Sequence, residues 1–180
     1  MEWRNVYRGW SKERNTWIYG SLWQDKTRNL IAPVEKKNGD YKFTLRFEEV
    51  EDDFVSQCVG IFAKTITSGG KEWVPVFIGD LISVTYKSGK TQMYYIQYID
   101  AIDKVEVTAF GDGYFTNSYR GKSGWFDTGS YYKATGEVFE WSDFYQKIMD
   151  EKRGAEDIYV MFDSRTSRQF LNLDWEKYNE

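Results

Sequence analysis

Hydrophobic and polar residues form their most regular strand-like pattern between Val74 and Ile99, in the stretch VPVFIGDLISVTYKSGKTQMYYIQYI. The two halves of this stretch, before and after Ser88-Gly89, are rich in β-branched and aromatic residues, and Ser88-Gly89 marks a turn between them. The second half, from Thr91 to Ile99, carries apolar residues on both faces, which predicts a central strand covered on both sides. We therefore expect an antiparallel hairpin on which the rest of the chain packs. At the turn that precedes Leu81, Gly79 is expected to need a positive φ or a close backbone approach, and Asp80 is expected to cap the turn through its own backbone amides.

A second hairpin is predicted from Trp3 to Leu22, with the polar segment SKERNT as its turn. Trp3, Trp10 and Trp17 are spaced by seven, a spacing that a helical heptad would also give. Interrupting glycines and polar residues argue against the helix, so we interpret the spacing as a consequence of hairpin length.

Clean alternation predicts a strand at Tyr41–Phe47 whose Tyr41, Phe43, Leu45 and Phe47 face the core. Further strands are expected at 54–62, 105–110 and 158–162. The one convincing helix is Trp141–Arg153, with Ser142 as its N-cap and Gly154 at its end. The pattern predicts a mainly β protein, a barrel-like arrangement of antiparallel strands with one α-helix in the C-terminal half, in a single domain over residues 1–180.

Composition narrows the chemistry more than it narrows the fold. The 180 residues include 8 Trp, 14 Tyr and 12 Phe, which suits a core closed by large rings. There is no His and a single cysteine, Cys58, so His-based catalysis, disulfides within the chain and cysteine zinc sites are excluded. We predict no catalytic residues, no metal, no cofactor and no enzymatic activity. Cys58 is expected to be a small buried hydrophobe in a protein of the reducing cytoplasm.

Charge and hydropathy bear on partners. The N-terminus lacks the apolar core of a signal peptide, and no run of about 18 apolar residues predicts a membrane span. A net charge of −4 argues against nucleic-acid binding by bulk electrostatics, although a local basic face stays open, and Arg4, Arg8, Lys12 and Arg14 form one basic grouping. The acidic run EEVEDD at 48–53 lacks the glycine of a calcium loop and is interpreted as a solvated surface.

The segment Gly111–Gly136 combines glycines, seven aromatic residues and a few cations, the pattern in which rings stack unpaired bases or sugars at roughly 1–3 kcal/mol per base. The alternative, which we favour, is one or two short hairpins whose rings pack on the barrel. The candidate binding residues here are Tyr114, Phe115, Tyr119, Arg120, Lys122, Trp125 and Tyr131.

Two segments, YRGWSKERNTWIYGSL and VGIFAKTITSGGKEWVPVFIGDLISV, resemble the YopX family of small phage and prophage proteins. The residues that carry the resemblance include Trp10, Trp17, Tyr19, Gly20, Gly79 and Asp80. The sequence departs from the family pattern at Ile78, where a glutamate is usual, and at a small insertion over 74–76. The resemblance covers residues 1–115 and implies a mostly β fold with a small barrel-like core there. Residues 116–180, which it does not reach, are expected from their own pattern to form an elaboration with an aromatic loop, a helix and a terminal strand. The resemblance also implies a phage or prophage origin and lends no catalytic residues.

These observations lead to three hypotheses of function. The first is a phage-derived, non-enzymatic cytoplasmic binding or regulatory protein that engages another protein. The second is a single-stranded nucleic-acid-binding module that uses the aromatic and basic loop 114–133. The third, a carboxylate enzyme using two of Asp80, Glu106, Asp112 and Asp127, requires two acids facing one another across a cleft at about 5–10 Å.

Overall fold

The structure is a computed structural model of the chain that describes residues 3–67, 69–99, 102–121 and 124–165; at residues 36, 53, 66–67, 112–121 and 124–134 it describes the backbone alone. Strands dominate the described residues, and α1 (Trp141–Met149) is their one α-helix. The predicted fold class, mainly β with one helix in the C-terminal half, is confirmed. No helix among the described residues is long and apolar enough to cross a membrane.

The chain divides into two compact units. Unit 1 comprises Met1–Phe62 and Trp73–Ile78, and unit 2 comprises Ala63–Glu72 and Gly79–Glu180. The chain passes from one unit to the other within β6 (Ser56–Thr67) and returns within β7 (Gly70–Phe77). The division expected between residues 115 and 116 falls inside β10 (Lys104–Gly121). A single domain over residues 1–180 stays a prediction.

Unit 1 is an open, antiparallel sheet with the strand order β6-β1-β2-β3-β4, in which β5 also pairs with β3. Its core includes Ile18, Ile31 and Val50. The elements of the unit, in chain order, are η1 (Trp3–Asn5), β1 (Tyr7–Ser11), β2 (Thr16–Gln24), β3 (Asn29–Lys37), β4 (Asp40–Phe43), β5 (Glu48–Val50), η2 (Asp52–Phe54) and the parts of β6 and β7 given above.

The N-terminal hairpin is confirmed: β1 and β2 pair in register, with Trp10 opposite Trp17 and their rings edge to face at 5.3 Å. Trp3 lies instead in the short η1, so the spacing of seven reflects no heptad. A Cβ at Gly20 would lie 1.9 Å from the carbonyl oxygen of Ala32 on the neighbouring strand, and glycine is therefore required there.

The expected core strand at 41–47 is wrong. The strand β4 ends at Phe43, and Tyr41, Phe43, Leu45 and Phe47 are all exposed, Leu45 at 98%. Alternation alone misled here because β4 lies at the edge of the sheet, where a strand has a neighbour on one side and little tertiary cover. The acidic run also differs from a fully solvated loop, because Glu48 is buried and pairs with Arg14.

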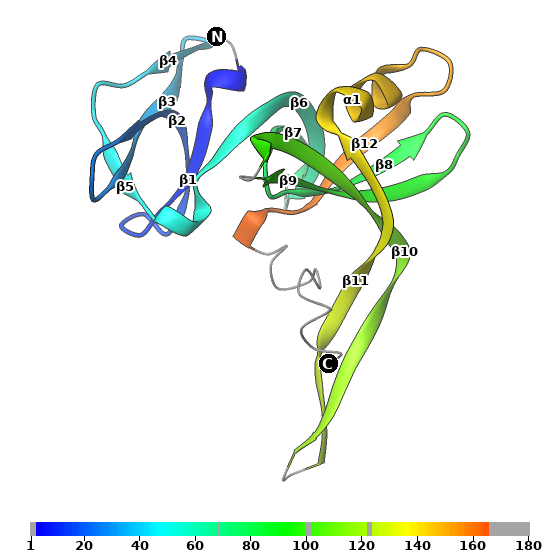
Figure 1. Ribbon diagram of the computed structural model, residues 1–180. Coiled ribbons are helices and arrows are strands. Elements are labelled where there is room, and N and C mark those ends of the chain that lie inside the picture. The colour runs from blue at the N-terminus through cyan, green and yellow to red at the C-terminus, as the bar shows by residue number, and fades with distance from the viewer. Residues whose placement is uncertain (1–2, 68, 100–101, 122–123, 166–180) are drawn as a thin grey trace. The chain divides into compact units, whose positions relative to one another are not determined.

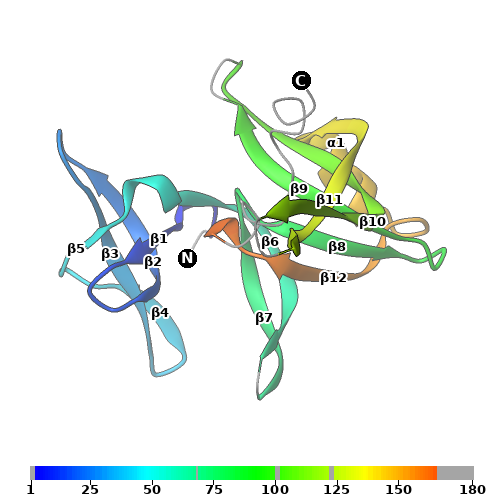
Figure 2. The ribbon, with the colours of Figure 1, turned by 90° about the horizontal axis from the view of Figure 1, so that it is seen from below.

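Unit 2 is also an open sheet, with the order β11-β10-β9-β8-β12-β6. Figure 2 shows β8 between β9 and β12. Neighbouring strands in this order are antiparallel, except that β12 and β6 pair in parallel. The sequence pattern, which indicated antiparallel strands, did not predict this parallel pair. Neither unit closes into a barrel among the described strands. The remaining elements are β8 (Leu81–Tyr86), β9 (Thr91–Ile99), β11 (Gly124–Glu140) and β12 (Ala155–Phe162).

The central hairpin is confirmed as β8 and β9, and the four consecutive residues 93–96 of β9 are all buried, as expected for a strand covered on both faces. Gly79 has φ +95 and lies so close to Ser164 that a Cβ would be 2.6 Å from that side chain. Asp80 is fully buried. Both residues therefore belong to the interior of unit 2.

The helix α1 is shorter than predicted and begins at Trp141 after an extended Glu140, so the expected N-cap at Ser142 is wrong. Its buried residues, Phe144 and Ile148, are four apart and face the sheet. The ring of Phe144 packs against Tyr94 of β9 at 4.8 Å. This contact fixes one face of the helix on the central hairpin.

The segment after Gly111 forms one long hairpin rather than one or two short ones. The pairing of β10 with β9 ends at Phe110, whereas β10 and β11 stay paired to Gly121 and Gly124. Figure 1 shows the two strands continuing together past the other strands of the unit. We call this distal part, residues 112–121 and 124–134, the arm.

Candidate functional site: a basic pocket in unit 2

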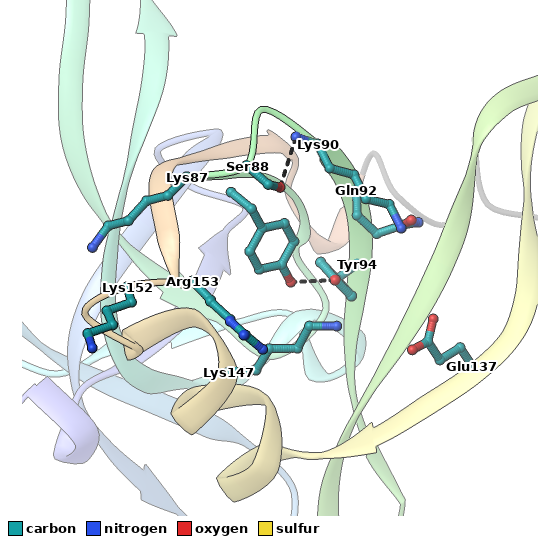
Figure 3. A pocket seen from close by; sticks show the side chains of 10 residues that line it. Lys87, Ser88, Lys90, Gln92, Tyr94, Glu137, Lys147, Lys152 and Arg153 are labelled. Carbon is teal, nitrogen blue, oxygen red and sulfur yellow. Dashed lines mark hydrogen bonds between the residues drawn. The ribbon is translucent and has the colours of Figure 1, made fainter.

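A hollow of about 510 Å³ opens in unit 2 beside the turn between β8 and β9. Figure 3 shows that Lys147 and Arg153 reach into it from the side of α1, while Lys90 and Gln92 line it from the β8–β9 hairpin. Its lining residues are Tyr86, Lys87, Ser88, Lys90, Gln92, Tyr94, Glu137, Lys147, Lys152 and Arg153. We call this hollow the basic pocket.

The first wall of the basic pocket is the tight β8–β9 turn. The backbone N–H of Tyr86 donates to the carbonyl oxygen of Lys90 at 2.8 Å, and the N–H of Gly89 donates back to Tyr86 at 2.8 Å. Gly89 has φ +88, a conformation that favours glycine. The turn sequence Lys-Ser-Gly-Lys thus brings two lysines, at 87 and 90, to the rim.

The second wall is the loop that follows α1, and Asp150 organises it. Its carboxylate accepts the backbone N–H of Lys152 at 2.9 Å and that of Arg153 at 2.7 Å. These bonds, to Arg153 first and then to Lys152, hold the pKa of Asp150 below its ordinary value. The acid therefore stays ionised near neutral pH and fixes the backbone that carries two of the pocket's cations.

Hydrogen bonds join the two walls. The N–H of Lys87 donates to the carbonyl oxygen of Gly154 at 3.0 Å, and the Lys87 ammonium donates to the carbonyl oxygen of Glu151. Gly154 is buried, and a Cβ there would lie 2.3 Å from the carbonyl oxygen of Asp150 and 2.5 Å from that of Ile148. Glycine is the residue that lets the loop pass this close to the end of the helix.

The floor is a buried pair of tyrosines, Tyr86 and Tyr94, whose hydroxyls share a hydrogen bond. Burial raises the pKa of both phenols, and the mutual hydrogen bond raises that of Tyr94 further. Both are therefore neutral at pH 7. Above them the Lys147 ammonium lies 4.8 Å from the ring centre of Phe139 and 5.5 Å from that of Tyr86, where the ring faces hold a cation favourably.

The charge of the lining is one-sided, with five cationic side chains and the single acid Glu137. Within the part of the chain that the structure describes, no hydrogen bond or ion pair occupies the terminal groups of Lys90, Lys152 or Arg153. Clustered cations raise one another's electrostatic energy; the Asp150 carboxylate offsets part of this near Arg153 and Lys87, and a bound anion would relieve more of it. The arrangement is suited to binding an anion. It shows no nucleophile next to a base, which a covalent mechanism would need.

The binding residues expected from the sequence lie on the arm. Tyr114, Phe115, Tyr119 and Arg120 are on β10, Trp125 and Tyr131 are on β11, and Lys122 lies outside the described residues. The backbone register places Tyr114 opposite Tyr132, Phe115 opposite Tyr131, Tyr119 opposite Phe126 and Arg120 opposite Trp125. The side chains of these residues are outside the description, so their role as binding residues stays a prediction.

Of the residues that carry the family resemblance, Gly20, Gly79 and Asp80 are buried, Trp10 and Trp17 are partly buried, and Tyr19 is 37% exposed. The Tyr19 ring packs on Phe77 at 5.5 Å, and Arg8, from the basic grouping, is buried between the rings of Trp17 and Phe77 at 4.4 and 4.6 Å. Of the acids weighed for a carboxylate enzyme, Asp80 is buried, and the side chains of Asp112 and Asp127 fall outside the description.

Sequence reasoning missed the basic pocket. Its cations come from two short stretches, KSGK at 87–90 and EKRG at 151–154, together with Lys147 from the helix. Each stretch contains a glycine, a residue typical of turns, which could have indicated that the neighbouring lysines and arginine lie at the surface. Their convergence depends on the hydrogen bonds between Lys87 and residues 151 and 154, which no local pattern reveals.

A second hollow, of about 360 Å³, lies in unit 1 and is lined by Lys12, Glu13, Glu49, Val50, Glu51 and Asp52. It is acidic, but the described residues contain no group of three or more side chains placed to hold a metal ion. The acidic run therefore gains no metal site from the described structure.

No protein-family model, no curated protein and no solved structure matches the chain. By its own structure the chain is a mainly β protein of two units, and the second unit carries the basic pocket beside the β10–β11 hairpin. The YopX resemblance stays a prediction.

Proposed function

We propose that this protein is a non-enzymatic binding protein and that its basic pocket holds an anionic group of the partner. The observation that carries the proposal is the gathering of five cations against one acid in a chain whose net charge is −4. Among the described residues no ion pair neutralises Lys90, Lys152 or Arg153, so these side chains are available to an anion in the pocket.

The pocket suits phosphate better than a lone carboxylate. Its volume of about 510 Å³ lies in the range of pockets for ligands of drug size, about 300–1,000 Å³. Lysine acts on phosphate as a point charge, and arginine adds a planar fork of donors. The neutral hydroxyls of Tyr86 and Tyr94 leave the floor uncharged, so the rim sets the sign of the ligand.

The broader setting belongs to the same proposal. The single Cys58, free and buried, supports a role in the reducing cytoplasm. The family resemblance supports a phage or prophage origin and a regulatory role, with a protein as the leading partner and nucleic acid as the alternative.

Isothermal titration calorimetry with tripolyphosphate at low salt tests the pocket. The double variant Lys152→Gln/Arg153→Gln removes two unpaired cations, and Lys26→Gln/Lys42→Gln removes two exposed lysines of unit 1 as the matched control. A hydrogen bond to a charged group contributes about 1.5–3 kcal/mol, so the pocket variant should bind at least about tenfold more weakly and the control should match the wild type. Equal weakening in both variants, or no binding by the wild type at millimolar tripolyphosphate, would refute the proposal.

A further inference from the structure

We infer that the ligand of the basic pocket is a small sugar phosphate, whose phosphate meets the cations and whose hydroxyl groups donate to the carboxylate of Glu137. The inference rests on the proposed function, because it names the chemical class of the anion that the same pocket holds. It concerns the pocket alone and leaves the rest of the surface to a protein partner. Three observations carry it: the bonding of the Glu137 carboxylate, the side of the pocket from which it comes, and the backbone that holds it.

Glu137 is the one acid of the pocket lining, and it pairs with none of the cations around it. In the part of the chain that the structure describes, its carboxylate makes no hydrogen bond and no ion pair. The Lys147 ammonium lies instead at the rings of Phe139 and Tyr86. The acceptor sites of the carboxylate are therefore open to a ligand in the pocket.

Glu137 and the cations line different sides of the pocket. Glu137 belongs to β11, whereas the cations belong to the β8–β9 turn, to α1 and to the loop after α1. Figure 3 shows Glu137 on the side of β11, across from Lys152 and Arg153. Burial is the main cause of the raised pKa of Tyr86 and Tyr94, and the charge of Glu137 adds to it, which places the acid near the floor. The pocket thus offers one side to an anion and another to a hydrogen-bond donor.

A β-bulge holds Glu137 at the pocket. At Ala109 of β10 the register shifts, so that three residues of β11, 135–137, lie opposite one. Gly136 has φ +87 within this bulge. The hydroxyl of Thr135 donates to the carbonyl oxygen of Ala109 at 3.0 Å and accepts the backbone N–H of Glu137 at 3.2 Å. Bulges of this kind occur beside active sites, where they direct a side chain, and here the bulge fixes the backbone that carries the acid.

Hydroxyl groups suit this arrangement better than other donors do. Five cations already face one acid, so a ligand ammonium at Glu137 would add a further positive charge to the pocket. An inorganic polyphosphate would set its own negative charge against the carboxylate. Neighbouring hydroxyls of a sugar can donate to a carboxylate without adding charge, as ribose does to an acidic residue in dinucleotide sites. A sugar phosphate therefore satisfies both sides of the pocket at once.

Calorimetry with two bisphosphates of equal charge tests the inference. Fructose bisphosphate carries sugar hydroxyls, and hexanediol bisphosphate has the same number of carbons without them. The wild type should bind fructose bisphosphate about tenfold more tightly, because hydrogen bonds to a charged acceptor are the stronger class. Lys152→Gln/Arg153→Gln should weaken both ligands by a similar factor, because these cations face the phosphates that both ligands share.

Glu137→Gln separates a role in specificity from a structural one. The change keeps the size of the side chain and removes its charge. It should weaken fructose bisphosphate about fivefold and tighten hexanediol bisphosphate about twofold, because the hydrogen bonds lose their charged acceptor and the repulsion of phosphate ends. A disturbed fold would instead weaken both ligands. Glu156→Gln, at an exposed acid of β12 outside the lining, is the matched control and should leave both affinities unchanged.

Three results would overturn the inference alone. Equal binding of the two bisphosphates by a wild type that binds tripolyphosphate leaves the proposed function standing and removes the sugar. A preference for fructose bisphosphate that persists in Glu137→Gln removes the role of this acid. Tighter binding of a phosphoserine peptide than of fructose bisphosphate assigns the pocket to a protein partner. If the wild type binds neither the bisphosphates nor tripolyphosphate, the inference and the proposed function both fail.

Discussion

Replacement of Gly154 by alanine tests the construction of the basic pocket most directly. The new methyl group would lie 2.3 Å from the carbonyl oxygen of Asp150 and 2.5 Å from that of Ile148, distances that real Cβ atoms essentially never show. Both obstacles are backbone atoms at the end of α1, so no side chain can rotate away. The loop must shift, and the N–H of Gly154 must leave its bond to Asp150 while the carbonyl of Gly154 leaves Lys87.

The expected loss of stability follows from these contacts. Two hydrogen bonds contribute about 1 kcal/mol each, and an extra methyl group forced into a packed position costs about 1–3 kcal/mol. Against this, alanine restricts the unfolded chain and returns about 0.4–1 kcal/mol. Gly154→Ala should therefore lower the free energy of unfolding by about 2–4 kcal/mol, and tripolyphosphate binding should weaken because the loop carrying Lys152 and Arg153 moves.

Urea unfolding followed by circular dichroism measures the stability, and calorimetry with tripolyphosphate measures the binding. Gly39→Asn is the control, because Gly39 has φ +86 with nothing within 4 Å of its added Cβ, and asparagine tolerates that conformation. It should cost under about 1 kcal/mol and leave binding unchanged. If Gly154→Ala instead unfolds within about 0.5 kcal/mol of the wild type and binds normally, the two walls of the pocket are not joined as argued.

Two further predictions concern unit 1. Arg8→Lys should lower the free energy of unfolding by about 1–2 kcal/mol, because lysine keeps the charge but loses the planar contacts with Trp17 and Phe77. Urea unfolding measures this loss, and a value below about 0.5 kcal/mol would contradict the importance of these contacts. For Asp25, hydrogen bonds from the backbone N–H of Thr27 and then from the side chain of Arg28 lower the carboxyl pKa from 3.8 to about 2, so carbon-detected NMR should give a titration midpoint near 2. Its stabilising contribution is present above pH 3.8 and lost as the pH falls toward 2, and the pH dependence of stability in that window should be smaller in Asp25→Asn. A midpoint near 3.8 would refute the assignment.

At the exposed edge of unit 1, the alternation of apolar residues over 41–47 predicted burial that the structure does not show. Leu45 alternates as a core residue should, yet it lies beyond the end of β4 and is 98% exposed. A strand at the edge of a sheet is buried only when another layer covers it, and alternation in the sequence carries no information about that layer. Glu48 is the reverse case, an acid in a polar run that is buried and pairs with Arg14.

By itself the sequence determined the N-terminal hairpin, the central hairpin, the fold class and the burial of Cys58, because β-branched and aromatic periodicity and glycine turns act over a few residues. Tertiary structure decided the candidate site. The lysines at 87 and 90 and the cations at 152 and 153 are more than sixty positions apart in the chain. They share one hollow because Gly154 lets the loop after α1 come close enough for its carbonyl to accept the N–H of Lys87. Such long-range convergence depends on packing between elements, which local residue patterns do not encode.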